Sequence, residues 1–580
     1  MNAEISLHNR YYPWTEGKAD GDASWLKGTL FYESDLIQGR DVVRLFSSVL
    51  GDSRIDHEAL KYLLLALNGN FALVMETSRY IFCTVDRIRS IPLFYAVSEK
   101  EVIFSDDANH LRNHMNPPFN EGNGAEFLVT GYVTGPDTLF DGISQLQAGE
   151  YLVYDKTDNS LTTQFYHRFW HENYFSDSEE DLLNRLDEVF VRVFQRLIES
   201  TKGLQIVVPL SGGLDSRIIV TMLKRLGVED VICFSYGKKG NREAAISRQV
   251  AEALGYQWYF VEHTRGKLYD NYHSDDMRRY LDYGGNLVSL PHIQDFFAVK
   301  ELKDEGKIPE NAVFVPGHSG DMLAGSHIPL DYDQPQAYIF EKFLEDNLKK
   351  HYSLWGWNEA ELLPLFKDKI RKCVGDISVH DNVSCANTIE LFDFHERQAK
   401  FIVNSVRVYE FFGFKWQIPL WDAELIDFFL RVPTSYRINQ LLYKNYAKMK
   451  LFTRELQSLS EIECTTDILS DPESMNSPIM SLTHKVVTRW ENICDVRWGR
   501  FFRFPLLSSL YFARVFDVMG IRDYPLMRNV VLNYSNAKHL QISLNGCVTL
   551  QYSLAQTSNY HGVTSKFNSG LRPGCRESST

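Results

Sequence analysis

Hydrophobic residues between positions 182 and 261 follow two alternating periods. Leu182, Leu186, Val189 and Val193 recur at helical spacing and predict a helix over 171–200. Short apolar runs then alternate with stretches of helical spacing, as in buried parallel strands joined by helices. These runs predict strands at 206–210, 231–236 and 258–261, with helices from 216 onwards and at 243–254. The order predicts a doubly wound parallel sheet, in which ligands bind beyond the carboxyl ends of the strands.

The pattern on either side of this sheet is different. Residues 1 to about 170 alternate β-like runs with turns, and residues 336–429 are helical in spacing and rich in aromatic side chains. Ser, Asn and Gly are frequent in residues 545–580, which predicts a poorly ordered tail. Because the chain is too long for one core, we expect four parts. They are 1–170, 171–455, a helical extension at 456–544, and the tail at 545–580.

Composition narrows the class of protein. The chain has 580 residues, 44% of them hydrophobic, and a net charge of −14 with both signs interspersed. This balance argues against a nucleic-acid surface and favours a soluble cytoplasmic protein. The eight cysteines are scattered without CxxC pairs, as free thiols in a reducing compartment would be. The first residues lack a signal-peptide pattern, and no apolar run approaches the length needed for membrane insertion.

The turn between the first predicted strand and its helix carries the clearest chemistry. From Ser211 to Ser216 it reads SGGLDS. Two adjacent glycines let the backbone approach an anion, and the free N–H groups of a helix start, with two serine hydroxyls, favour phosphate. Neither GxxxxGK[ST] nor GxGxxG is present. Asp215 would repel phosphates unless a divalent cation lay between them, so the turn predicts phosphate bound with Mg²⁺.

This turn resembles the pyrophosphate-binding loop of the ATP pyrophosphatases. A second stretch, NAVFVPGHSGDMLAG at 311–325, resembles the asparagine synthetase element VLSGEGSDELFGG, with Gly317, Asp321 and Gly325 at matching places. The resemblance implies an enzyme that cleaves ATP between the α and β phosphates, adenylates a carboxylate and releases pyrophosphate. It also implies that Asp215 and Asp321 together hold Mg²⁺.

The resemblance assigns further residues, with the adenine near Leu210 and Tyr236. The implied contacts of ATP and pyrophosphate are Leu210, Ser211, Gly212, Gly213, Leu214, Ser216, Tyr236, Pro316 and Gly317. The implied catalytic residues are Asp215, His318 and Lys444. A family lysine that reaches the phosphates has its matching place at Gln440 in this chain. Lys444 lies one helical turn after Gln440.

The second turn departs from the family in two places. Pro316 replaces a usual serine, and His318 replaces a glutamate. A histidine can accept a proton near neutral pH but cannot hold an ammonium ion as a carboxylate can, which makes aspartate a doubtful substrate. A purely structural role for His318, as a cap of the turn, is the alternative.

Phrases between residues 69 and 146, such as GNFAL and IPLFY, resemble the later half of the class II glutamine amidotransferase domain. That domain is a sandwich of antiparallel sheets between helices, and it precedes the ATP domain in asparagine synthetases. Its glutaminases use a cysteine directly after the initiator methionine, where this chain has Asn2. We interpret residues 1–170 as a degenerate domain kept for scaffolding, without glutaminase activity. An ordinary β-rich packing domain would give the same pattern.

The resemblances imply an α/β protein, with a degenerate N-terminal-nucleophile-type αββα sandwich followed by a doubly wound, adenine nucleotide α hydrolase-like ATP pyrophosphatase domain whose C-terminal half is helical. The implied activity is that of an AMP-forming carbon–nitrogen ligase. Its nitrogen donor would be ammonia, the product of a separate glutaminase, or an amine. Relatives with a similar second turn suggest that the carboxylate belongs to a uronic acid sugar of a surface polysaccharide. A homodimer is compatible with the resemblance.

Two alternatives stay open. The chain could be an amide-closing cyclase of the β-lactam synthetase or lasso-peptide type, which also lacks the nucleophilic cysteine. It could also be a non-catalytic scaffold with a vestigial ATP site, although the intact SGGLDS turn and Asp321 argue against this.

Overall fold

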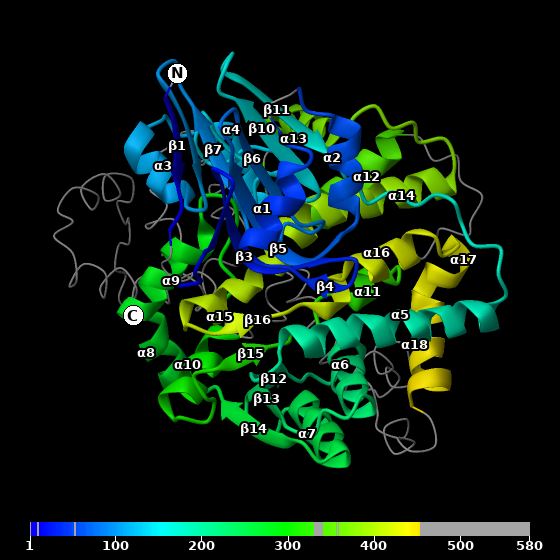
Figure 1. Cartoon of the computed structure of the whole chain (residues 1–580). Coiled ribbons are helices and arrows are strands. Elements are labelled where there is room, and N and C mark those ends of the chain that lie inside the picture. The colour runs from blue at the N-terminus through cyan, green and yellow to red at the C-terminus, as the bar shows by residue number, and fades with distance from the viewer. Residues whose placement is uncertain are drawn as a thin grey trace, which may run out of the picture.

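Two units that contain β-sheets, with helices around them, make up the structure, and Figure 1 shows the N-terminal unit above the second one. The computed structural model describes residues 2–8, 11–51, 54–329, 340–354, 357 and 359–452. The parts expected at 456–544 and 545–580 lie outside the described residues.

The N-terminal unit is a sandwich of two sheets. The larger sheet has the strand order β11-β10-β6-β5-β3-β2, with β4 paired to β3, and the smaller has the order β1-β8-β7-β9. Strands β1 and β8 run parallel, unlike the antiparallel pairs elsewhere in the sandwich, so the expectation of purely antiparallel sheets fails at this edge. From β1 the chain crosses into the larger sheet, so no hairpin dictates the direction of its partner. The strands are β1 Asn2–Ser6, β2 Thr15–Ala19, β3 Asp22–Tyr32, β4 Asp35–Leu36, β5 Leu67–Glu76, β6 Tyr80–Val85, β7 Phe94–Val97, β8 Glu101–Ser105, β9 Ile143–Gln145, β10 Glu150–Asp155 and β11 Ser160–Phe165.

Helices cover both outer faces of this sandwich. Helices α1 (Arg40–Ser47) and α2 (His57–Leu65) share one hydrophobic cluster with the larger sheet, to which Phe46 and Leu60 contribute. Helix α3 (Ala108–Met115) packs on the smaller sheet through Leu111. Buried side chains of both sheets meet in the main core between them, which α4 (Glu121–Thr130) also joins. The predicted αββα arrangement is therefore confirmed.

The second unit contains five parallel strands in the order β14-β13-β12-β15-β16. The chain winds outwards from β12 to β14, then returns to add β15 and β16 on the other side. This confirms the predicted doubly wound sheet, with its switch point between β12 and β15. The strands are β12 Gln205–Pro209, β13 Val231–Gly237, β14 Gln257–Glu262, β15 Ala312–Phe314 and β16 Lys415–Trp416.

The first helix of this unit begins later than predicted. Helix α5 starts at Glu179 rather than near 171, because Ser178 caps it by accepting a hydrogen bond from the Asp181 N–H. The helices of this part are α5 Glu179–Ser200, α6 Leu214–Arg225, α7 Arg242–Leu254, α8 Arg265–Tyr272, α9 Asp275–Gly285, α10 Phe296–Asp304 and α11 Gly320–Leu323.

The C-terminal half is helical, as predicted, and includes an unusual segment. Helix α14 continues directly into the π-helix η1, which spans ten residues, whereas π-helices are mostly single turns at functional sites. The helical elements are α12 Phe340–His351, α13 Glu359–Val374, α14 Asn382–Phe392, η1 Asp393–Ile402, η2 Val403–Val406, α15 Arg407–Phe411, η3 Pro419–Trp421, α16 Ala423–Leu430, α17 Thr434–Arg437, η4 Ile438–Gln440, α18 Leu441–Tyr446 and η5 Ala447–Leu451.

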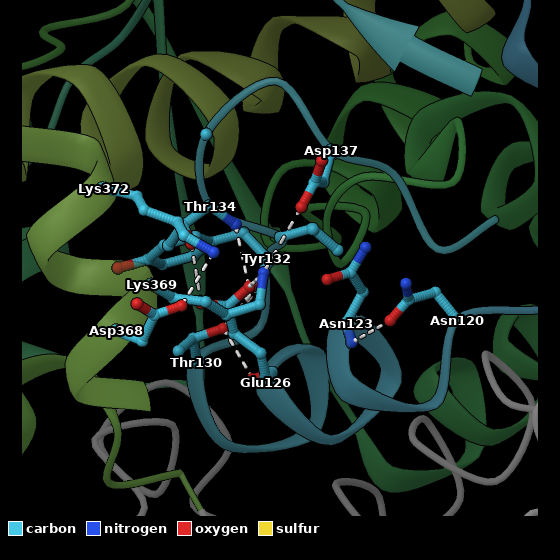
Figure 2. A network of polar contacts seen from close by, with 12 residues as sticks. Asn120, Asn123, Glu126, Thr130, Tyr132, Thr134, Asp137, Asp368, Lys369 and Lys372 are labelled. Carbon is cyan, nitrogen blue, oxygen red and sulfur yellow. Dashed lines mark hydrogen bonds and ion pairs between the residues drawn. The ribbon is translucent and has the colours of Figure 1, made fainter. Parts of the chain in front are cut away.

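A buried polar cluster ties the sandwich to these helices. Glu126 of α4 is fully buried and accepts hydrogen bonds from the hydroxyls of Thr134 at 2.7 Å and Tyr352 at 2.8 Å. Figure 2 shows Lys369 of α13 directed at the same carboxylate, to which it lies 3.0 Å away. A second tie joins Asn68 of β5 to Asp422, which also receives two hydrogen bonds from Arg196. The two units are thus held in one arrangement by charged and polar contacts as well as by their shared core.

In the described part of the chain, no helix combines the length and the apolar character needed to cross a membrane.

Candidate functional site

The loops that follow β12 and β15 lie against each other at the switch point of the sheet. The connections of these neighbouring strands leave in opposite directions, and in open α/β sheets the ligand crevice lies at such a switch point, beyond the carboxyl ends of the strands. The approach is close, because a Cβ atom on Gly317 would lie 2.8 Å from the backbone nitrogen of Ser216. The structure therefore brings together the two turns that the sequence singled out.

Two aspartates, one from each loop, lie next to each other at this switch point. Asp215 lies in the first turn of α6 and Asp321 in the first turn of α11. The backbone N–H of Asp321 donates to Oδ2 of Asp215 at 3.3 Å, and the Tyr443 hydroxyl donates to Oδ1 of Asp215 at 2.8 Å. Ser326 Oγ donates to Oδ2 of Asp321 at 3.1 Å. Each carboxylate still has lone pairs available to a ligand.

The electrostatics of this pair suit a divalent cation. Burial and the neighbouring charge of Asp321 raise the pKa of Asp215 to about 8. Among the described residues, no group of three or more His, Cys, Asp and Glu side chains is placed to hold a metal. Two aspartates, with phosphate oxygens and water, nevertheless match the habit of Mg²⁺, which takes one or two carboxylates beside substrate phosphates. The residues present therefore fit Mg²⁺.

The serine hydroxyls and backbone N–H groups of the glycine turn form hydrogen bonds with one another. Ser216 Oγ accepts from the Ser211 N–H at 3.1 Å, and Ser211 Oγ accepts from the Gly213 N–H at 3.1 Å. The two hydroxyl oxygens lie 3.0 Å apart. Leu214 begins α6, so Gly212 and Gly213 stand directly before a helix N-terminus. A phosphate entering here would meet these N–H groups and the positive end of the helix dipole.

His318 reaches from the second loop to the helical half. Its Nε2 lies 2.9 Å from Ser405 Oγ, whose single hydrogen is donated to the Ile402 carbonyl at 2.7 Å. The hydrogen-bond network therefore assigns the His318 proton to Nε2 and leaves Nδ1, which is buried and has no hydrogen-bond partner, as an acceptor. Burial lowers the pKa of His318, which favours the neutral ring. Helix α11 has no side-chain cap, so His318 does not cap this turn.

Tyr236, the residue expected beside the adenine, lies near the end of β13, and its side chain is held by two neighbours. Its hydroxyl donates to Asp295 at 2.6 Å, and the Tyr409 hydroxyl donates to the other oxygen of the same carboxylate. Its ring stacks on His263, with the ring centroids 5.0 Å apart. Leu210 continues the sheet through its N–H, which donates to the Phe234 carbonyl at 2.8 Å, and Pro316 is buried.

The expected pairing of Gln440 with Lys444 on one helix face is wrong. Gln440 and the preceding Asn439 have φ values of 62° and 56°, and α18 begins only at Leu441. Gln440 therefore stands outside the helix that carries Lys444. The residue that reaches Asp215 is Tyr443, and no local pattern singles it out beyond its place next to Lys444. The role of Lys444 stays a prediction.

Gly317 offers a direct test of the contact between the two loops. We expect Gly317→Ala to weaken ATP binding at least about tenfold, because its Cβ would meet the backbone of Ser216, which no side-chain rotation can relieve. Titration calorimetry with ATP and Mg²⁺ measures this loss. Gly266→Ala is the matched control, since its Cβ would have no neighbour within 4 Å. Equal ATP affinity in both variants would show that the loops do not need to touch.

Two regions of the chain match models of known protein families. Residues 199–455 match the family model described as asparagine synthase, and residues 57–170 match the glutamine amidotransferase domain. A curated relative, a probable glutamine-hydrolysing asparagine synthetase of Acanthamoeba polyphaga mimivirus, is 30% identical over 273 residues. This match covers 46% of this chain and 46% of that protein, so the chain spans about half the length of the relative.

Solved structures similar to parts of this chain share low sequence identity with it. The NH3-dependent NAD synthetase of Campylobacter jejuni is 13% identical, with 35% of this chain and 90% of that chain covered and a TM-score of 0.18. The glutamine phosphoribosylpyrophosphate amidotransferase of B. subtilis is 11% identical, with 44% and 51% covered and a TM-score of 0.17.

Proposed function

The chain is an asparagine synthetase-family protein, and from that premise we propose that it is an ATP-dependent amide ligase. Its substrate carboxylate would attack the α-phosphate of ATP and release pyrophosphate, and a nitrogen nucleophile would then displace AMP from the acyl-adenylate. One observation carries the proposal. Asp215 and Asp321, which follow two neighbouring strands, meet through a 3.3 Å hydrogen bond beside the glycine turn.

The residues of the chain would act mainly by positioning. Asp215 and Asp321 would hold Mg²⁺, which when bound neutralises the charge that develops on the leaving pyrophosphate. The glycine turn would bind the phosphates through N–H groups at the start of α6. Tyr443 fixes the orientation of Asp215 through its 2.8 Å hydrogen bond. A site built this way lowers the barrier because its dipoles are already oriented.

His318 would handle the proton of the nucleophile. Its Nδ1 is the free acceptor on a neutral ring, and Ser405 fixes the ring from the other side. Deprotonating an amine as it attacks the acyl-adenylate requires such a base within hydrogen-bond reach. A neutral imidazole would not retain an ammonium ion as a carboxylate does, which supports a substrate other than aspartate, such as a uronic acid sugar.

The nitrogen source follows from the first residues. Asn2 opens β1 at the edge of the smaller sheet, and its amide side chain cannot attack glutamine. We therefore propose that ammonia, a separate glutaminase or an amine substrate supplies the nitrogen.

Exchange of labelled pyrophosphate into ATP tests this function. We expect exchange that requires Mg²⁺ and one carboxylate from a panel of aspartate, uronic acid sugars and amino acids with free amines, without glutamine hydrolysis. A cyclase would form product from a substrate with its own amine, with no added ammonia. ATP binding without exchange on any carboxylate would contradict the ligase and favour a scaffold.

A further inference from the structure

Arg397 is a half-buried arginine on η1 whose charge is not matched nearby. Among the described residues, its guanidinium forms no hydrogen bond or ion pair. An arginine carries five N–H donors and a permanent charge, so partial removal from water costs free energy unless an anion pairs with it. A side chain of this kind is suited to a ligand that brings the anion.

The contacts of its neighbours show which way Arg397 faces. Arg397 lies four residues after Asp393 and four before Phe401, and a π-helix turns about once every four to five residues, so the three share one face. Asp393 accepts a hydrogen bond from His327, which follows the second site loop, and the Phe401 ring lies 5.9 Å from that of His292. The face that Arg397 shares with Asp393 and Phe401 is therefore directed towards His327 and His292.

The carboxylates closest in sequence to Arg397 are engaged elsewhere. Glu396 accepts from Lys400 at 2.6 Å and from the Gly135 N–H at 3.0 Å. Asp393 is bonded to His327 and accepts from Gln398 at 3.2 Å. Neither can neutralise Arg397 without breaking a buried interaction.

Two histidine nitrogens on this side of the site also lack a hydrogen-bond partner. Nδ1 of His292 and Nδ1 of His318 are both buried without a hydrogen-bond partner. Burial lowers the pKa of His292 to about 3, which favours the neutral ring. The region thus joins one cation to two neutral rings beside the proposed reaction centre.

We propose that Arg397 binds a second anionic group, a carboxylate or a phosphate, on the acyl substrate. The inference rests on the proposed function and narrows its substrate to acids that carry two or more negative charges. Guanidinium groups match both kinds of anion through paired hydrogen bonds, and the π-helix aims this one at the His292 and His318 side of the crevice. Arg397 would then set specificity, while the aspartates and His318 serve the reaction.

Matched pairs of acids test the proposal by pyrophosphate exchange. One pair is aspartate and β-alanine, and the other is a nucleoside diphosphate-linked glucuronate and free glucuronate. In one pair, we expect the acid with the additional anionic group to have a kcat/KM about 10- to 100-fold higher than that of its partner acid. The pair that shows this difference identifies the additional anion as carboxylate or phosphate. Arg397→Gln should remove this preference by raising KM with little change in kcat, and Arg397→Lys should restore part of it.

Two controls separate this inference from the proposed function. Arg278→Gln removes an exposed arginine on α9 and should leave the preference unchanged. Titration calorimetry with the same acids and without nucleotide measures the contribution of Arg397 to acid binding, even in a protein that shows no pyrophosphate exchange. Equal losses for both members of each pair in Arg397→Gln, or equal acid binding by this variant and the original protein, would overturn the inference. Thermal unfolding of each variant establishes that it is folded.

Discussion

Replacing Asp215 by Asn should abolish pyrophosphate exchange and, at the same time, stabilise the ligand-free protein near pH 8. The amide cannot serve as an anionic Mg²⁺ ligand, so we expect activity to fall by about three orders of magnitude. The amide also removes a carboxylate that burial and Asp321 make costly to ionise. Exchange assays and urea unfolding of the same samples measure both effects.

The stability effect has a definite pH dependence. The pKa of Asp215 is about 8 in the folded protein and 3.8 as an ordinary aspartate, so the folded state holds this proton more tightly. The contribution to stability is complete below pH 3.8 and is lost as the pH rises to about 8. Compared with the variant, the unaltered protein should therefore lose stability across this window, by about 1–3 kcal/mol for this partly exposed group.

Two controls accompany this experiment. Asp376→Asn changes an exposed aspartate and should affect neither quantity. Mg²⁺ with ATP should stabilise the unaltered protein but not Asp215→Asn, because ligands stabilise only the state that binds them. If Asp215→Asn kept more than about a tenth of the exchange rate, or if its stability difference did not change with pH, Asp215 would not be a ligand of the metal site.

Replacing Arg437 by Met should be the most destabilising single change among the contacts described. Arg437 and Glu390 are both fully buried, with Nη1 and Oε2 2.6 Å apart. Burial works against ionisation of Glu390, yet the charges of Arg437 and His171 hold its pKa at about 2. Loss of the arginine leaves an uncompensated buried carboxylate, which costs about 3–5 kcal/mol. The total stability of a domain is only about 5–15 kcal/mol.

Urea unfolding near pH 7 and pH 4 measures this change. The depressed pKa of Glu390 gives stability that is present above its ordinary value of 4.5 and is lost as the pH falls towards 2. The variant should therefore differ most from the unaltered protein near neutral pH. The double variant Arg437→Met with Glu390→Leu should recover much of the loss, because it leaves no isolated charge. A single variant as stable as the unaltered protein would mean that water reaches Glu390.

The strands and turns that bind phosphate in our proposal were predictable because their signals are local. The apolar run before Ser211, the two glycines and Asp215 occur within a dozen residues, and the second turn repeats the same logic. The partners of those residues were not predictable. Ser405 lies 87 positions from His318, and Tyr443 lies 228 positions from Asp215. Only the tertiary fold brings such residues together, so their roles have no nearby sequence pattern.

Other departures have equally physical causes. Strand β16 has two residues, too few for any periodic pattern, and it exists because β15 offers it an open edge. The π-helical path of η1 depends on packing around it rather than on helix propensity. Gln440 adopts a left-handed conformation that a non-glycine residue takes only when its surroundings impose it. The helical spacing of its sequence gave no sign of this.

Glu126 shows how the first domain supports the helical half of the chain. Two of the side chains that contact this carboxylate, Tyr352 and Lys369, come from the C-terminal half of the chain. Deleting the first domain would leave Lys369 without its counter-ion and would expose the apolar surface against which it packs. The shape of the first domain therefore matters to its neighbour, whatever chemistry the first domain itself performs.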